Sequence, residues 1–177
     1  MATAPGSLAM VQRFINTADL EAAADGLRTP EALRTWLRQN VREPGAVGES
    51  DLAVALTLRE ALRDLAEANN GGSPAPSALQ VLNRVADRAR LAPRFAAGGA
   101  RLEPLAGGVD AALGELVAAV YEAMASGAWA RLKACARHRC RWAFYDASRN
   151  RSGTWCSMRV CGNREKAQRF RRRAARA

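Results

Sequence analysis

Histidine and cysteine are almost absent from most of this chain of 177 residues. The one histidine is His138, and no cysteine precedes Cys135. The first 130 residues also contain no phosphate-binding glycine motif and no carboxylate pair that stands out from ordinary helix surface charge. Without histidine, cysteine or a conspicuous carboxylate pair, this part of the chain has no recognisable catalytic constellation. A structural or partner-binding role is favoured for it.

Long hydrophobic segments are missing as well. No run reaches about 18 apolar residues, the length that a membrane-spanning helix needs. The N-terminal stretch MATAPGSLAMVQRF lacks the basic segment and apolar stretch of a secretory signal. We therefore expect a cytoplasmic protein without a membrane partner. In that reducing compartment, paired cysteines are expected to bind metal rather than to form disulfides.

Acidic residues are scarce at the C-terminal end of the chain. Residues 131–177 contain 15 Lys and Arg but only Asp146 and Glu165 as acids, a net charge of +13. The preceding 130 residues contain 12 basic and 15 acidic side chains, a net charge of −3. A nearly neutral body that carries a cationic end indicates a polyanionic partner. Nucleic acid is the most common partner of this kind, and an acidic membrane surface is less common.

The front of the chain has the apolar periodicity of α-helices. One helix is expected over residues 11–22, another after the N-cap Thr29, and a long one over residues 50–68. Asn16 is unusual inside a helix. We expect its side chain either to hydrogen-bond to a neighbouring element or to be solvated at the surface.

The pattern continues with a helix capped by Ser77 and then changes in residues 89–105. Two short runs around a Gly-Gly turn predict a β-hairpin there. Helical spacing returns over residues 109–127, where Tyr121 and Met124 are included in the expected buried face.

All four cysteines lie in one short stretch as two matched pairs. Cys135 and Cys140 form the first pair, fifteen residues follow, and Cys156 and Cys161 form the second. Two such pairs suit one tetrahedral zinc ion bound by four thiolates, and a closed site of this kind is structural because it leaves no position for water. We therefore predict that the protein binds one structural Zn²⁺ and is not an enzyme. The alternatives are reduced core cysteines without metal, and His138 as a ligand in exchange for a cysteine.

The stretch around the cysteines predicts a small module after a helical domain. An aromatic strand is expected at residues 141–146 and its returning partner at 154–155, followed by a basic helix at 163–175. Knuckle, β-hairpin, knuckle and helix is the order of a treble-clef-like zinc finger. The predicted fold is mainly α, with a helical domain with a small β-hairpin at residues 8–128 and the zinc finger at 129–177.

Several short motifs in this module occur together. They are Leu132-Lys133-x-Cys135, Cys140-Arg141-Trp142-x-Phe144-Tyr145-Asp146, Ser148-x-Asn150-x-Ser152, Trp155-Cys156-Ser157-Met158 and Cys161-Gly162-Asn163-Arg164. The segment resembles the CGNR zinc finger, a family named after the last of these runs. One departure is Gly153-Thr154, which stands where that family commonly has a basic pair and so removes charge.

The front of the chain is similar to the ABATE domain, which usually precedes the finger in that family. The similarity covers residues 8–125 and includes the run Phe14-Ile15-Asn16-Thr17. The resemblance implies a bacterial transcription regulator that binds zinc through its finger, located in the cytosol or nucleoid. The resemblance also implies that the helical half is associated with stress-induced regulation.

These observations lead to a DNA-binding hypothesis, in which arginines of the finger contact phosphates or guanines. The helical half would sense a ligand or mediate assembly, for example as a homodimer. The expected nucleic-acid contacts are Arg149, Arg151, Arg164, Lys166, Arg171 and Arg172, with Arg137, Arg139 and Arg141 as secondary candidates.

Two other binding functions remain open. The finger could be an interaction module for an acidic protein or for its own helical domain, although a nearly neutral front half favours an external partner. It could also bind RNA, if its aromatic side chains stack on bases rather than form a small core. Those side chains are Trp142, Phe144, Tyr145 and Trp155.

Overall fold

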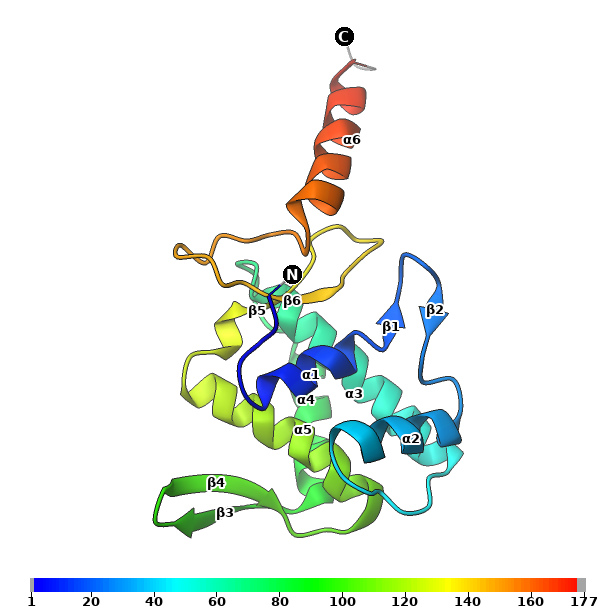
Figure 1. Cartoon of the computed structure of the whole chain (residues 1–177), viewed down its shortest axis with the longest axis vertical. Helices are drawn as coiled ribbons and strands as arrows, with labels where there is room; N and C mark the ends of the chain where they lie inside the picture. The colour runs from blue at the N-terminus through cyan, green and yellow to red at the C-terminus, as the bar shows by residue number, and fades with distance from the viewer. Residues whose placement is uncertain (1, 175–177) are drawn as a thin grey trace.

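The computed structural model describes residues 2–174, which form a helical body with the C-terminal module on one end (Figure 1). The helices within this range are α1 (Leu8–Ile15), α2 (Pro30–Asn40), α3 (Glu49–Ala68), α4 (Pro76–Ala89), α5 (Gly108–Ala125) and α6 (Asn163–Ala174). The strands are β1 (Ala18–Asp19), β2 (Ala24–Asp25), β3 (Leu91–Ala96), β4 (Gly99–Pro104), β5 (Leu132–Ala134) and β6 (Ala143–Tyr145). The predicted mainly α fold with small hairpins is confirmed.

The five helices from α1 through α5 share one hydrophobic core. Helix α3 packs against α1, α2 and α4, and α5 packs against α1 and α4. Fully buried side chains such as Phe14, Leu58, Leu62 and Leu116 fill the space between these helices. Burial of this apolar surface is the main stabilising term for the helical body. No helix within residues 2–174 has the length and apolar character to span a membrane.

Helix α1 is shorter than its apolar spacing predicts. It ends at Ile15, not at Ala22, and the chain then forms the short antiparallel pair β1–β2. Asn16 is the C-cap residue of this helix, and its side-chain amide hydrogen-bonds to the backbone of Ala143. This contact confirms that Asn16 bonds to a neighbouring element. The Asp19 carboxylate then accepts the backbone N–H groups two and three residues further on, which stabilises the turn.

The starts of two helices show which capping signals prevail. Thr29 caps α2 as predicted, because its Oγ1 accepts the backbone N–H of Ala32 at 3.2 Å. The predicted Ser77 cap of α4 is wrong, since that helix begins at Pro76 and its N-cap residue is Ala75. Proline has no N–H to satisfy and a helical φ, so it starts the helix before the serine can cap it.

The predicted hairpin and the following helix both form. Strands β3 and β4 pair antiparallel, with Leu91 opposite Pro104. In α5, however, Tyr121 and Met124 are 55% and 42% exposed instead of buried. Tyr121 and Met124 lie one turn after the buried Val117 and Val120, toward the helix end, where the described chain covers them only in part. Periodicity shows which residues share a face but not where the covering elements end.

Candidate functional site

The first cysteine pair lies at the tip of a hairpin that the sequence did not predict. Strand β6 pairs antiparallel with β5, which precedes the cysteines, and Ala134 lies opposite Ala143. The expected partner at residues 154–155 is not a strand. The pairing is different because Leu132, Ala134 and Ala143 are fully buried in the core of the helical body. That burial is a long-range effect, and the local alternation of the sequence does not report it.

The four cysteine sulfurs come together as one group. The Sγ atoms of Cys135, Cys140, Cys156 and Cys161 all lie within 4.8 Å of one another. The Cys140–Cys156 and Cys156–Cys161 distances are 3.7 and 3.6 Å. Zn–S bonds of about 2.3 Å in a tetrahedron require sulfurs about 3.8 Å apart. The cysteines are free thiols, and their geometry and soft donor atoms fit a single structural zinc ion.

The electrostatics of the group also favour a cation. Hydrogen bonds from Cys140 and Cys156 lower the pKa of Cys135 to about 2. The pKa of Cys140 rises to about 12 because its thiol bonds to Cys135, and the pKa of Cys156 is raised for the same reason. Without a cation, Cys135 therefore carries a negative charge while Cys140 and Cys156 keep their protons. A divalent metal ion compensates the charge of four thiolates and makes full deprotonation favourable.

Aromatic and small residues enclose the sulfurs. Trp142 and Trp155 pack against the cysteines. After the second pair begins, the chain makes a single π-helical turn at Met158–Gly162, which leads directly into α6. A Cβ on Gly162 would lie 2.4 Å from the sulfur of Met158 and 3.2 Å from a Trp155 ring carbon. A larger residue here would therefore force the Met158 side chain to move and would crowd the Trp155 ring. These indoles belong to the small core around the sulfurs.

The other two aromatics of the strand also lie in cores. Phe144 is buried, and Tyr145 packs partly buried against the core of the helical body. A ring that is covered on its faces cannot stack on a base. The RNA hypothesis, which needed exposed aromatic faces, has no support from this arrangement.

A buried ion pair organises the loop between the two cysteine pairs. Both of its residues belong to the family motifs, but no sequence pattern indicated their contact. Lys133 and Asp146 are each 4% exposed, and their charged atoms are 2.9 Å apart. The Lys133 ammonium also donates to the carbonyls of Arg151 at 2.6 Å and Gly153 at 3.0 Å. One lysine therefore fastens both sides of this loop to β5.

The Asp146 carboxylate completes the arrangement. Burial alone would raise the pKa of Asp146, but hydrogen bonds from Ser148 and Lys133 outweigh that effect and lower the pKa below its usual range. Its oxygens also accept the backbone N–H of Gly153 at 2.7 Å. A Cβ at Gly153 would lie 2.9 Å from the carboxylate carbon and both oxygens. Gly153, which stands where the family commonly has a basic residue, therefore allows the backbone to approach the Asp146 carboxylate this closely.

The module is attached to the helical body by amide side chains. Asn16 donates to the carbonyl of Ala143 and accepts its N–H, both at 2.8 Å, and thus occupies the place of a neighbouring strand beside β6. On the other side, Asn69 donates to the carbonyls of Trp129 and Leu132, each at 2.8 Å. Asn70 likewise donates to Ala134. The short hairpin therefore has its free backbone groups satisfied by the front of the chain.

Arginine contacts reinforce this attachment. Arg63 of α3 is fully buried and donates to the carbonyl of Ile15 at 2.7 Å and to that of Arg141 at 3.0 Å. The Arg141 guanidinium forms ion pairs with Asp64 at 2.6 Å and Glu67 at 2.7 Å, both on α3. Docking of the finger on its own helical domain was disfavoured from the net charge, and that inference is wrong. A near-zero total charge can include a local acidic face, and α3 has one.

A second acidic contact comes from the turn between β1 and β2. Glu21 forms ion pairs with Arg137 of the first cysteine pair, at 2.6 Å, and with Arg164 at the start of α6. The hydrogen bond from Arg137 lowers the pKa of Glu21, so the carboxylate is charged near neutral pH. Arg137, Arg141 and Arg164, all considered as nucleic-acid contacts, are therefore engaged within the chain.

The remaining candidates are differently placed. They are exposed on the loop after β6, on the first knuckle or on α6: Arg149 and Arg151, Arg139, and Lys166, Arg171 and Arg172. The ion pairs seen among residues 2–174 do not include Arg149 or Arg151. Helix α6 projects away from the body (Figure 1), and Phe170 on it is 74% exposed. Residue 175, the expected helix end, lies outside the described residues.

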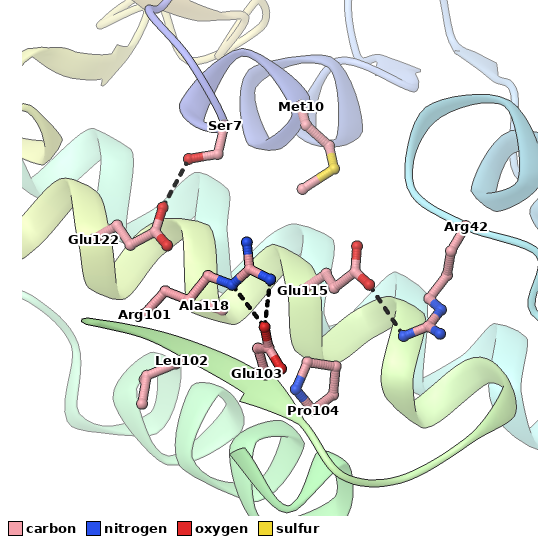
Figure 2. Close-up of a pocket in the computed structure, with 10 residues that line it drawn as sticks. All are labelled: Ser7, Met10, Arg42, Arg101, Leu102, Glu103, Pro104, Glu115, Ala118 and Glu122. Atoms are coloured by element: carbon pink, nitrogen blue, oxygen red, sulfur yellow. Dashed lines mark hydrogen bonds and ion pairs between the residues drawn. The ribbon is translucent and has the colours of Figure 1, made fainter. Parts of the chain in front are cut away.

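The helical body also contains a cleft, and none of the four cysteines lines it. It encloses about 610 Å³ between α1, α5, β4 and the segment after α2, with Met10 and Ala118 among its apolar residues (Figure 2). Each of its carboxylates has a partner in the cleft: Glu103 with Arg101, Glu115 with Arg42, and Glu122 with Ser7. No sequence pattern indicates this cleft, because its residues come from several segments, the most distant of which are more than 100 positions apart.

Comparison with known families agrees with this geometry. Residues 131–174 match the CGNR zinc finger. Residues 8–137 match the ABATE family, described as "Putative stress-induced transcription regulator". A search of curated proteins finds no match. The two matches overlap at β5 and the first cysteine, where the finger joins the body. The chain thus belongs to the ABATE family and carries a CGNR zinc finger, the combination of a zinc-binding regulatory protein.

Proposed function

We propose that the protein is a cytoplasmic, DNA-binding transcription regulator whose finger contacts DNA while the four cysteines hold one structural zinc. The observation that carries the proposal is the exposure of basic side chains on two parts of the finger, the loop after β6 and helix α6. Residues 131–177 contain only two acidic residues, and Asp146 is buried with Lys133. The exposed surface of the finger is therefore strongly cationic and suited to phosphates.

The shape of α6 supports double-stranded DNA as the polyanion. A helix of 12 residues is about 18 Å long, and the major groove of B-DNA admits a single α-helix. Because α6 projects from the body, a duplex can approach it without a clash with α1 to α5 (Figure 1). Arg171 and Arg172 lie toward the outer part of this helix. Most such contacts reach phosphates, which give affinity, whereas contacts to base edges give sequence preference.

Zinc has a structural function in this proposal. The second cysteine pair ends in the turn Met158–Gly162, from which α6 continues directly. Tethering Cys156 and Cys161 to the same ion as the first pair determines where α6 starts and in which direction it points. With four thiolates bound, the ion has no open position for water, so it supplies no catalytic chemistry.

Ligand sensing is proposed for the cleft in the helical body. Its mixed charges suit a small polar molecule with both cationic and anionic groups. Helix α1 links this cleft to the finger, since Ser7 and Met10 line the cleft and Asn16 holds Ala143 of β6. A ligand that shifts α1 would therefore change the support of the finger. Assembly, for instance as a homodimer, is the other role proposed for this half.

DNA binding can be tested with the zinc-loaded full chain and a labelled duplex. We expect log K to decrease steeply with log salt, and the Arg149→Ala, Arg151→Ala double variant to reduce the slope by about 2, because each lost phosphate contact removes about 1. Arg38→Ala is a control for the loss of a surface arginine, since Arg38 is also exposed but lies on α2. Absence of binding near about 50 mM salt, or a slope close to zero, would contradict the proposal.

A further inference from the structure

The turn between β1 and β2 places one carboxylate between two arginines of the finger. Glu21 contacts Arg137, which lies between the first two cysteines, and Arg164, which lies three residues after the last one. In the sequence, Arg137 lies within the first cysteine pair and Arg164 follows the second. Their guanidinium groups meet at the same Glu21 oxygen, Oε1.

Stability alone does not account for this arrangement. The side chains of Glu21 and Arg164 are 35% and 54% exposed, whereas Arg137 is 18% exposed. Water and salt screen ion pairs to a carboxylate in such a position, so they contribute only modestly to folding. The hairpin is held elsewhere, by Asp25 on β2. That carboxylate forms two hydrogen bonds to the buried Arg59, at 2.7 and 2.8 Å. Glu21 can therefore leave the arginines while the base of its hairpin stays in place.

The space beside Glu21 is hollow. A depression of about 460 Å³ lies between the turn and the second cysteine pair, with Trp142, Ser157 and Arg164 among the residues that line it. A phosphate group offers the same kind of acceptor oxygens as a carboxylate and more of them. Two converging guanidinium groups are the usual arrangement for binding such an anion. The position of the Glu21 oxygen therefore marks where a phosphate oxygen would lie.

We propose that Arg137 and Arg164 form a phosphate-binding clamp that Glu21 occupies as an internal competitor. This inference rests on the proposed function, because the phosphate is taken to belong to the DNA backbone. Bound DNA displaces Glu21 from the clamp, and the displacement reduces the net affinity. The β1–β2 turn thus sets how tightly the finger holds DNA, and its neighbours in the helical body can influence that affinity.

The test compares Glu21→Gln with the unaltered full chain, both loaded with zinc. Glu21→Gln should bind duplex about tenfold more tightly at low salt, because DNA no longer has to displace a charged competitor. The salt slope should stay nearly the same, since Arg137 and Arg164 contact phosphates in both complexes. Adding Arg164→Ala to Glu21→Gln should remove most of this gain. The control is Asp87→Asn, which removes the same charge from an exposed position near the end of α4.

Inorganic pyrophosphate provides a second arm that does not depend on DNA. Glu21→Gln should bind this probe more tightly than the unaltered chain, and the Arg164→Ala combination should lose the difference. If duplex binds but Glu21→Gln behaves like Asp87→Asn, the clamp is refuted and DNA binding stands. If no variant binds duplex, the DNA proposal fails. In that case, tighter pyrophosphate binding by Glu21→Gln than by the unaltered chain would show that the clamp binds another phosphate compound. Equal pyrophosphate binding by the two proteins would refute the clamp as well.

Discussion

The two halves of this molecule are stabilised in different ways. Residues before β5 form five helices around a core of fully buried leucines and other apolar side chains. The finger has no comparable core, since its own buried cluster consists of Cys135, Cys140 and Cys161 with two tryptophans and Cys156 around them. Its remaining support is the buried Lys133–Asp146 pair and the polar contacts to the helical body.

The difference follows from size. A module of about 45 residues cannot bury enough apolar surface to offset its conformational entropy, so it needs metal, ion pairs or a neighbour. This finger uses all three. The helical body is therefore expected to withstand the loss of the finger better than the finger withstands the loss of any one support.

The largest effect should come from removing a metal ligand. Cys156→Ser is expected to abolish zinc binding and unfold the finger, because structural zinc contributes about 10–16 kcal/mol in isolated fingers. The front helices should keep most of their helical signal. Zinc content by mass spectrometry and hydrogen exchange resolved by segment would test this difference between the halves.

The control for that variant is His138→Ala. His138 is exposed beside the first cysteine pair, so its removal should leave zinc content and exchange unchanged. If Cys156→Ser retains one zinc per chain, the four-thiolate assignment is wrong. If the front helices lose protection as well, the two halves form one cooperative unit and the contrast between them disappears.

A smaller but substantial loss is expected from Asp146→Asn. It leaves the Lys133 ammonium buried without a charged partner, which costs about 3–5 kcal/mol at buried positions. Urea unfolding of the zinc-bound chain would measure this loss. Asp110→Asn is the control, because the Asp110 pair with Arg88 is partly exposed and should contribute less than about 1 kcal/mol.

The same pair predicts a pH dependence. The pKa of Asp146 is lowered in the folded chain, so its contribution is fully present above the unfolded value of about 3.9 and is lost as pH falls further. The stability difference between Asp146→Asn and the unaltered chain should therefore be constant from pH 5 to 8. A difference that already shrinks across that neutral range would contradict the assignment.

The smallest effect concerns the junction of the halves. Asn16→Ala removes two hydrogen bonds to Ala143 and should cost about 1–3 kcal/mol, because the Ala143 N–H is left without a partner while its carbonyl keeps the hydrogen bond from Gln12. Zinc should remain bound. Hydrogen exchange should accelerate in β5 and β6 before it does in α3, which would separate the halves further. Gln39→Ala on the exposed face of α2 is the control, and equal exchange in both variants would show that Asn16 does not couple the halves.

Local signals in the sequence predicted much of the fold and the metal centre. The Thr29 cap, the β3–β4 hairpin and the spacing of the four cysteines depend on residues close together in the chain. The failures concern contacts between distant residues. The partner of β6 is β5 because both are buried in the helical core, and the Lys133–Asp146 pair forms only when that hairpin closes. Neither effect leaves a periodic pattern in the sequence.

The arginines show the same division. By itself the sequence determined that the C-terminal end is strongly cationic and that its cysteines can form one zinc site, because charge counts and ligand spacing are local properties. Only the tertiary structure decided that Arg141 holds the finger to α3 and that Glu21 covers Arg137 and Arg164. The physical reason is that an ion pair depends on distance in space, and the chain brings acidic residues to the finger from more than 70 positions away.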